Sequence, residues 1–292
     1  MVPPLLSVMR IEQWYKNFVI FVGLVFSLNL TNPQMLIQSS LAFVVFCLLS
    51  SAVYIINDIK DIESDRHHPK KKNRPIPSGK IPLNHAWALS LTLMFISLFL
   101  GFYLRNLFGF ICVTYLLLNL LYTYWLKSYA IVDVMMISIG FVLRAIGGTV
   151  VIDVRTSPWL IICSFLLALF LAVIKRKNEL LQTTRHKEHR ESLAYYTQDV
   201  LDNFLTITVT SLLITYMIYT FESGHIYMMA TIPFAFIGVF RYIQLAGSTE
   251  SDSPTFIFKD RITQLNILLW ILVSIAALYE LIPIFLNPLI QS

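Results

Sequence analysis

The chain has 292 residues, of which 57% are hydrophobic and only 13% are charged, and its mean hydropathy is +0.68. Long apolar runs alternate with short polar breaks, a pattern that argues against a soluble domain and is typical of a polytopic membrane protein. The formal net charge of +5 does not indicate nucleic-acid binding, because the basic residues lie in loops that also carry most of the acids.

Nine apolar segments are long enough to be candidate membrane spans, since a helix needs roughly 20 apolar residues to cross the hydrocarbon core. In chain order, the predicted spans cover residues 14–30, 35–56, 84–104, 106–126, 129–151, 157–175, 203–221, 226–246 and 264–286. No small-residue cleavage pattern follows the first of them, so we interpret it as an anchor rather than a signal peptide. The predicted fold is all-α, a single integral-membrane domain over 1–292, with about nine transmembrane helices around a central cytoplasm-facing cavity.

The distribution of basic residues predicts the orientation of these spans. Nine spans place the two termini on opposite faces, and the face that holds the N-terminus carries 18 of the 22 lysines and arginines. The opposite face has only Arg105 and Arg155, while Arg144 and Arg241 fall inside predicted spans. By the positive-inside rule the crowded face is cytoplasmic, which predicts a multi-pass protein of the cell inner membrane with a cytoplasmic N-terminus.

Two long charged loops on that face, 57–83 and 176–202, are the candidate functional loops. No glycine or proline separates either loop's first residues from the preceding span, so we expect each helix to continue past the membrane boundary. The three cysteines fall within predicted spans and show no metal-ligand spacing, which favours apolar core roles for them.

Three aspartates at the start of the first loop predict a metal site. Asp58, Asp61 and Asp65 are spaced i, i+3 and i+7, so on a helix they share one face, whereas Glu63 points away from it. Like charges so arranged repel one another, so we expect a cation between them. Hard oxygen ligands suit Mg²⁺, which completes its shell with water and substrate phosphates. The alternative is a solvated loop on which acids and bases neutralise one another.

The bases that follow, Lys71, Lys72 and Arg74, provide charge for a phosphorylated substrate, and arginine can bind phosphate oxygens bidentately. Their alternative role is to set membrane topology. The same two interpretations apply to Lys16, which must reach the interface past aromatic neighbours. An aspartate just inside a span usually has a partner. We therefore interpret Asp133 and Lys127 as a pair that borders the site, beside Tyr124, in preference to a purely structural pair.

The remaining candidates lie in later spans and loops. Arg144 is within a span and must face the bundle interior, a partner or water, so its role is either helix packing or the shaping of the cavity. Lys175 and Glu179 at i, i+4 could form a plain helical ion pair. We nevertheless expect four residues at the end of the sixth span and in its loop to bind substrate: Lys175, Arg176, Glu179 and Arg190. We expect Arg261 to help close the cavity.

The stretch "NDIKDIESD", beginning at Asn57, resembles the first Asp-rich motif, NDxxDxxxD, of the UbiA-type intramembrane prenyltransferase superfamily. That resemblance implies a nine-helix fold, a Mg²⁺-dependent cytoplasmic site and a substrate-binding role for Asn57. Most members carry a second DxxxD motif after the sixth helix, but this chain reads "KRKNELLQTTRHKEHRESLAYYT" there.

That departure, with four further stretches in order, resembles the decaprenyl-phosphate phosphoribosyltransferase family: "RIEQWYKN", "HHPKKKNRPIPSG", "FVLRAIGG" and "SPTFIFKDRITQLNILLW". The resemblance implies transfer of 5-phosphoribosyl from phosphoribosyl pyrophosphate to a polyprenyl phosphate, with release of pyrophosphate. It implies that the substrate bound at the end of the sixth span is the donor, and that the alternative role of Arg144 is to shape the lipid-phosphate end of the cavity. The acceptor oxygen is already anionic, so no general base is required, and the sequence offers no catalytic triad. Two rivals remain: an ordinary prenyltransferase, disfavoured by the missing second motif, and a transporter, disfavoured because the charges cluster on one face instead of near the midplane.

Overall fold

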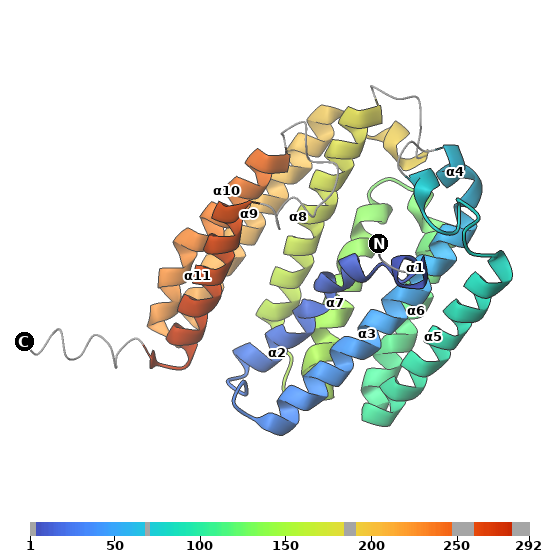
Figure 1. The fold of residues 1–292 in the computed structure, drawn as a ribbon. Coiled ribbons are helices and arrows are strands. Elements are labelled where there is room, and N and C mark those ends of the chain that lie inside the picture. The colour runs from blue at the N-terminus through green and yellow to red at the C-terminus, as the bar shows by residue number, and fades with distance from the viewer. Residues whose placement is uncertain (1–3, 68–70, 184–190, 247–259, 282–292) are drawn as a thin grey trace, which may run out of the picture. The chain divides into compact units, whose positions relative to one another are not determined.

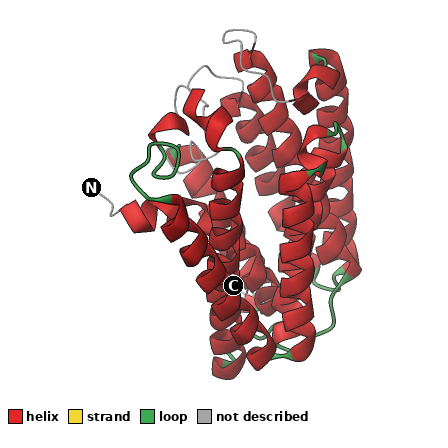
Figure 2. Ribbon diagram, turned by 90° about the vertical axis from the view of Figure 1, so that its right-hand side faces the viewer, coloured by secondary structure: helices red, strands yellow, loops and turns green. Residues whose placement is uncertain are grey.

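The computed structural model describes residues 4–67, 71–183, 191–246 and 260–281, and within these ranges every regular element is a helix (Figures 1 and 2). The chain divides into two compact units, Met1–Thr156 and Ser157–Ser292. Eight described helices are long and apolar enough to cross a membrane. The prediction of an all-helical polytopic membrane protein is confirmed, whereas the single-domain organisation stays a prediction.

The first unit is a helical bundle with short 3-10 turns at its connections. Its elements are α1 (Pro4–Val8), η1 (Ile11–Val19), α2 (Ile20–Phe26), α3 (Pro33–Lys60), α4 (Ile62–His67), η2 (Lys71–Asn73), α5 (Leu83–Leu104), α6 (Asn106–Tyr124), η3 (Leu126–Ser128) and α7 (Val132–Val151). The long helix α3 packs against α2, α5, α6 and α7. It begins sharply because Pro33 occupies its first turn and the Asn32 side chain accepts hydrogen bonds from the next two backbone amides.

The predicted first span, 14–30, forms two shorter pieces, η1 and α2, and is not among the eight helices long enough to span a membrane in the described chain. Charge and backbone geometry account for this difference. Glu12 and Lys16 lie in η1, and Leu28 adopts a positive φ of 61°, which ends the helical run after Phe26. The other predicted spans each correspond to one described helix or helix pair.

A close approach of two backbones holds α2 against α7. A Cβ atom at Gly148 would overlap the backbone carbonyl of Ile20, so only glycine fits there. Beside this crossing, Phe46 and Phe108 pack edge to face in the buried core. The crossing fixes the position of α7, which carries Arg144.

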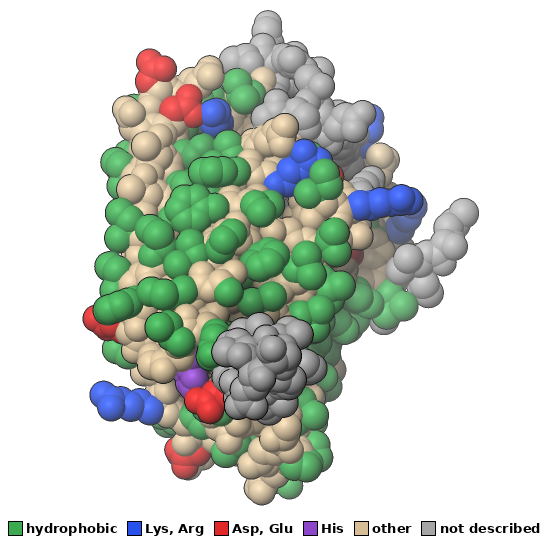
Figure 3. Space-filling model, turned by 90° about the vertical axis from the view of Figure 1, so that its left-hand side faces the viewer, with side chains coloured by type: hydrophobic (Ala, Val, Ile, Leu, Met, Phe, Trp, Pro, Cys, Tyr) green, Lys and Arg blue, Asp and Glu red, His purple; other side chains and the backbone are tan. Residues whose placement is uncertain are grey.

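The second unit contains α8 (Pro158–Thr183), η4 (Glu191–Tyr195), α9 (Gln198–Glu222), η5 (Ile226–Thr231), α10 (Ile232–Ala246) and α11 (Arg261–Leu278). Within this unit α8 packs on α9, and α11 packs on α10 and η5. Thr197 caps α9 and Asp260 caps α11 through side-chain oxygens that accept backbone amides. Figure 3 shows a face where hydrophobic side chains cover the middle and charged ones lie toward the two ends, as a lipid-facing surface requires.

Both predicted helix extensions are observed. The i, i+4 backbone bonding of α3 runs on into α4, because the amide of Asp61 donates to Asn57 and the amide of Asp65 donates to Asp61. Helix α8 likewise continues through Lys175 to Thr183. The absence of glycine and proline from these stretches therefore predicted the helices correctly.

Candidate active site

The C-terminal end of α3, with α4, places the acidic motif beside three basic segments of the first unit. Asp58 and Asp65 are each only 3% exposed. Burying ionised carboxylates is costly unless each is paired and hydrogen-bonded. Both are paired here, and their partners come from η2, from the residue that follows η2 and from the segment before η1.

Arg74 bridges the two buried carboxylates. Its Nη1 atom lies 3.1 Å from Asp58 Oδ1 and 2.7 Å from Asp65 Oδ2. Arg10 also pairs with Asp58 Oδ1, and the Nζ atom of Lys71 lies 3.7 Å from Asp65 Oδ1. In the described structure the positive group between Asp58 and Asp65 is an arginine side chain, and a Mg²⁺ ion held by the aspartates stays a prediction.

Asp61 faces a different partner, Lys127 of η3. It lies in the turn between α3 and α4, with φ −95° and ψ 14°. Among the described residues, no three His, Cys, Asp or Glu side chains lie close enough to bind one metal ion. Two of the three aspartates thus converge directly, and a site built from all three stays a prediction.

The candidates that border this cluster are spread over α3, α6 and α7. The hydroxyl of Thr123 donates to Asn57 Oδ1 at 3.4 Å. Tyr124 is 40% exposed, and its ring lies under the Lys60 ammonium. Asp133 is completely buried at the start of α7. Lys127 pairs with Asp61, and a pair between Lys127 and Asp133 stays a prediction.

Arg144 lies in the interior of the first unit and is 5% exposed. It donates hydrogen bonds to Asn17 Oδ1 at 2.7 Å, to the Gly140 carbonyl at 3.0 Å and to the Tyr115 hydroxyl at 2.6 Å. Its guanidinium also lies over the Tyr115 ring, with 4.7 Å to the centroid. These contacts favour the helix-packing interpretation, because they join η1, α6 and α7.

Residue-by-residue inspection of the sequence missed Arg10 and Tyr54. The Arg10 guanidinium lies 5.1 Å from the centre of the Tyr54 ring while it pairs with Asp58. Arg10 is the first residue of the stretch "RIEQWYKN", and its place in this family-like stretch could have marked it as a candidate site residue. Tyr54 lies inside an apolar span and carried no signal.

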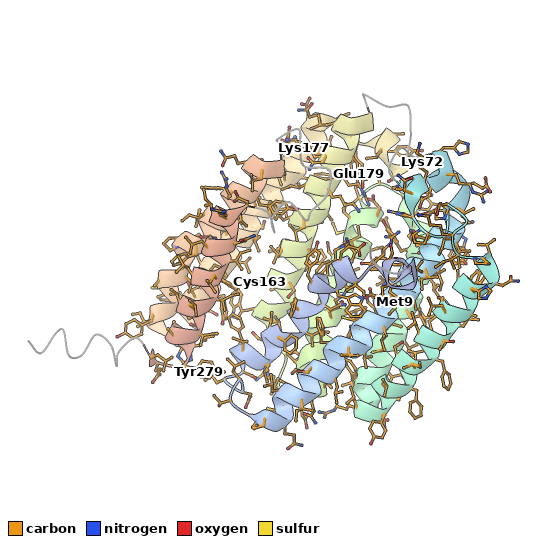
Figure 4. The ribbon with its side chains drawn as sticks, viewed as in Figure 1. Met9, Lys72, Cys163, Lys177, Glu179 and Tyr279 are labelled. Atoms are coloured by element: carbon orange, nitrogen blue, oxygen red, sulfur yellow. The ribbon has the colours of Figure 1, made fainter. Side chains whose placement is uncertain are left out.

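In the second unit, the end of α8 carries its own ion-pair group (Figure 4). Glu179 pairs with the buried Arg176 and lies 3.8 Å from Lys175. Lys177 pairs with Asp202 of α9. The helical pair between Lys175 and Glu179 is thus observed. Arg190 lies outside the described residues.

An ion pair joins α10 to the N-terminal cap of α11. The Arg241 guanidinium donates two hydrogen bonds to Asp260, at 2.7 and 3.1 Å, and Asp260 caps α11 at Thr263. The hydrogen bonds from Arg241 and then from Thr263 hold the pKa of Asp260 below its usual range. Arg261, the first residue of α11, is exposed.

These features define an all-helical, polytopic membrane protein with a buried acid–base cluster at one end of its longest helix. Residues 17–272 match the sequence model of the UbiA prenyltransferase family, and the chain belongs to that family. It is 31% identical to the decaprenyl-phosphate phosphoribosyltransferase of Mycolicibacterium smegmatis, over 96% of this chain and 93% of that protein. It is 32% identical to the protein of the same name from Mycobacterium tuberculosis, over 93% of each chain.

Solved structures agree with the fold. The structure of a UbiA homolog from Archaeoglobus fulgidus bound to GPP and Mg²⁺ superposes with a TM-score of 0.73. The superposition covers 95% of this chain and all of that one, at 15% sequence identity. At this identity the comparison supports the helical architecture only.

Proposed function

We propose that this protein transfers the 5-phosphoribosyl group of phosphoribosyl pyrophosphate to a polyprenyl phosphate and releases pyrophosphate. The observation that carries the proposal is the similarity, over almost the whole chain, to proteins named decaprenyl-phosphate phosphoribosyltransferase. The acid–base cluster supports it, because a donor with a diphosphate and a separate phosphate needs several bases near a metal site. Arg10, Lys71 and Arg74 meet that need at the two buried aspartates.

The donor set of the cluster fits Mg²⁺. Asp58 and Asp65 are buried carboxylates, and one atom of Arg74 lies within hydrogen-bonding distance of both, so their oxygens already converge on a single positive group. We propose that these two residues, with Asp61, hold the ion. When bound, Mg²⁺ would act as a Lewis acid on the leaving diphosphate.

The chain's own residues then have to bind and orient the two substrates. The bond from C1 of the ribose to the diphosphate oxygen breaks, and a bond from C1 to the anionic acceptor phosphate forms. Because that acceptor oxygen carries no proton, no side chain has to act as a base. The work left to Lys71, Lys72, Arg74 and Lys127 is to stabilise phosphate charge and align the donor.

Orientation in the membrane belongs to the same proposal. We place the N-terminus and both charged loops in the cytoplasm, because 18 of the 22 basic residues lie on that predicted face. A water-soluble donor would then reach the cluster from the cytoplasm while the lipid tail stays in the bilayer. Labelling of single cysteines placed at Lys80 and at Arg155 by a membrane-impermeant reagent tests this, since only the Arg155 position should react from outside.

The decisive experiment uses purified protein with radiolabelled phosphoribosyl pyrophosphate, a polyprenyl phosphate and Mg²⁺. We expect label in the lipid fraction and equimolar pyrophosphate, both abolished by a chelator. A parallel reaction offers a prenyl diphosphate with an aromatic acceptor. Consumption of the prenyl diphosphate without transfer from phosphoribosyl pyrophosphate would replace the proposal by the ordinary prenyltransferase activity.

A further inference from the structure

Arg74 occupies the space between two carboxylates that the proposed function assigns to a metal ion. Its Nη1 atom contacts Asp58 Oδ1 at 3.1 Å and Asp65 Oδ2 at 2.7 Å. The Arg74 side chain is 30% exposed, whereas both carboxylates are 4% exposed. The guanidinium therefore approaches the acids from the solvent side and can leave without unpacking the core.

The backbone beneath Arg74 is anchored, so a change of partner requires only the side chain to move. The amide of Arg74 donates to the Lys71 carbonyl at 3.0 Å, and its own carbonyl accepts the amide of Ser78 at 3.0 Å. Ile76, two residues later, is 2% exposed and packs in a core cluster with Ile55. The flexible side chain of Arg74 thus extends from a backbone turn that hydrogen bonds and core packing hold in place.

The charges around the two carboxylates oppose a metal ion as long as the bases stay in place. Asp58 and Asp65 bring two negative charges, and Arg10, Lys71 and Arg74 bring three positive ones. A divalent cation at the same oxygens would be repelled, because the three positive charges already exceed the two negative ones. A diphosphate that draws the bases away would remove that repulsion.

We propose that Arg74 is a built-in counter-ion that exchanges partners: the metal ion displaces it from Asp58 and Asp65, and the freed guanidinium binds the diphosphate of the donor. This inference rests on the proposed function for the identity of the donor. Metal and donor then bind with positive coupling, and by linkage each raises the affinity of the other by the same factor. Arg74 is accordingly a positioning residue for the metal as well as a ligand of the donor.

The test measures metal affinity without donor, using Mn²⁺ as a paramagnetic probe for the Mg²⁺ site in detergent-solubilised protein. Arg74→Gln removes the competing cation, and we expect donor-free Mn²⁺ affinity to rise about tenfold, the equivalent of one charge-assisted hydrogen bond. Lys80→Gln is the charge-matched control, since Lys80 is an exposed residue of the same loop. Lys80→Gln should change donor-free Mn²⁺ affinity by less than about threefold. Arg74→Lys keeps the positive charge but loses the two-pronged guanidinium, so its donor-free Mn²⁺ affinity should lie between those of Arg74→Gln and Lys80→Gln.

Unchanged or weaker Mn²⁺ binding in Arg74→Gln, with Arg74→Lys behaving like wild type, would overturn the exchange, because a purely structural Arg74 predicts that result. The second measurement repeats the titration with phosphoribosyl pyrophosphate present. Wild type should bind Mn²⁺ more tightly with this donor, and Arg74→Gln should lose most of that increase.

The same titration separates this inference from the proposed function. If a prenyl diphosphate tightens Mn²⁺ binding in wild type and phosphoribosyl pyrophosphate does not, the exchange stands and the proposed donor is wrong. If neither diphosphate changes Mn²⁺ affinity in wild type, the exchange itself is refuted, whatever the donor is.

Discussion

Replacing Asp65 by asparagine removes the charge of one of the two carboxylates that hold Arg74. The Asp65 side chain is 4% exposed, with Arg74 at 2.7 Å and Lys71 at 3.7 Å. A hydrogen bond to a charged group contributes roughly 1.5–3 kcal/mol. In the loaded enzyme Asp65 is proposed to contact Mg²⁺ in place of Arg74, and loss of a charged contact of that size from the transition state corresponds to about a ten- to hundredfold lower rate. Because Asp65 is also a proposed metal ligand, we expect the reduction at limiting Mg²⁺ to be about a hundredfold or more.

Glu63→Gln is the matched control on the same short helix. It removes the same charge, but the Glu63 side chain is 79% exposed and pairs across the surface with Arg66, at 3.3 Å. Exposed pairs of this kind contribute about 0–1 kcal/mol. We therefore expect turnover of Glu63→Gln to stay within about threefold of wild type.

The assay is transfer of radiolabelled phosphoribose to polyprenyl phosphate across a Mg²⁺ titration, with thermal unfolding in detergent to verify that each variant is folded. Wild-type turnover of Asp65→Asn at limiting Mg²⁺ would remove Asp65 from the metal site. Equal losses in Asp65→Asn and Glu63→Gln would mean that α4 does not present its acids on different faces.

Three further predictions concern the stability of each unit. Arg144→Leu leaves the buried oxygens of Asn17 and Tyr115 without their donor, so we expect a loss of roughly 2–4 kcal/mol in detergent unfolding; an unchanged melting temperature would show that these contacts are dispensable. Gly148→Ala should lower the melting temperature because its Cβ overlaps the Ile20 carbonyl, and a neutral result would place α2 and α7 further apart. The pKa of Asp260 is lower in the folded than in the unfolded state, so its ionised carboxylate stabilises the fold above the unfolded-state pKa of about 3.9. That stabilisation is lost as the pH falls through the folded-state pKa. Asp260→Asn should thus melt below wild type at neutral pH, and the difference should close only in acid.

The class of the protein and the placement of Asp58 and Asp65 on one side follow from the sequence alone. Apolar runs of membrane-spanning length specify the long helices, because backbone groups in lipid must be paired within their own segment. The absence of glycine and proline after Ile56 carries α3 into α4, which brings Asp58 and Asp65 to one side at i, i+7. Capping residues such as Asn32 and Asp260 likewise set helix starts through neighbours only two or three positions away.

The partners that those residues meet depend on how distant segments of the chain pack together. Arg10 reaches Asp58 across 48 positions of sequence, and Lys127 reaches Asp61 across 66. Arg144 joins Asn17 and Tyr115, which lie on two other elements. A local pattern cannot predict such pairs, because every exposed base near the membrane boundary satisfies the topology rule equally well. The choice among them depends on where η1, η3 and α7 pack against α3, and that packing is fixed by contacts such as Gly148 against Ile20.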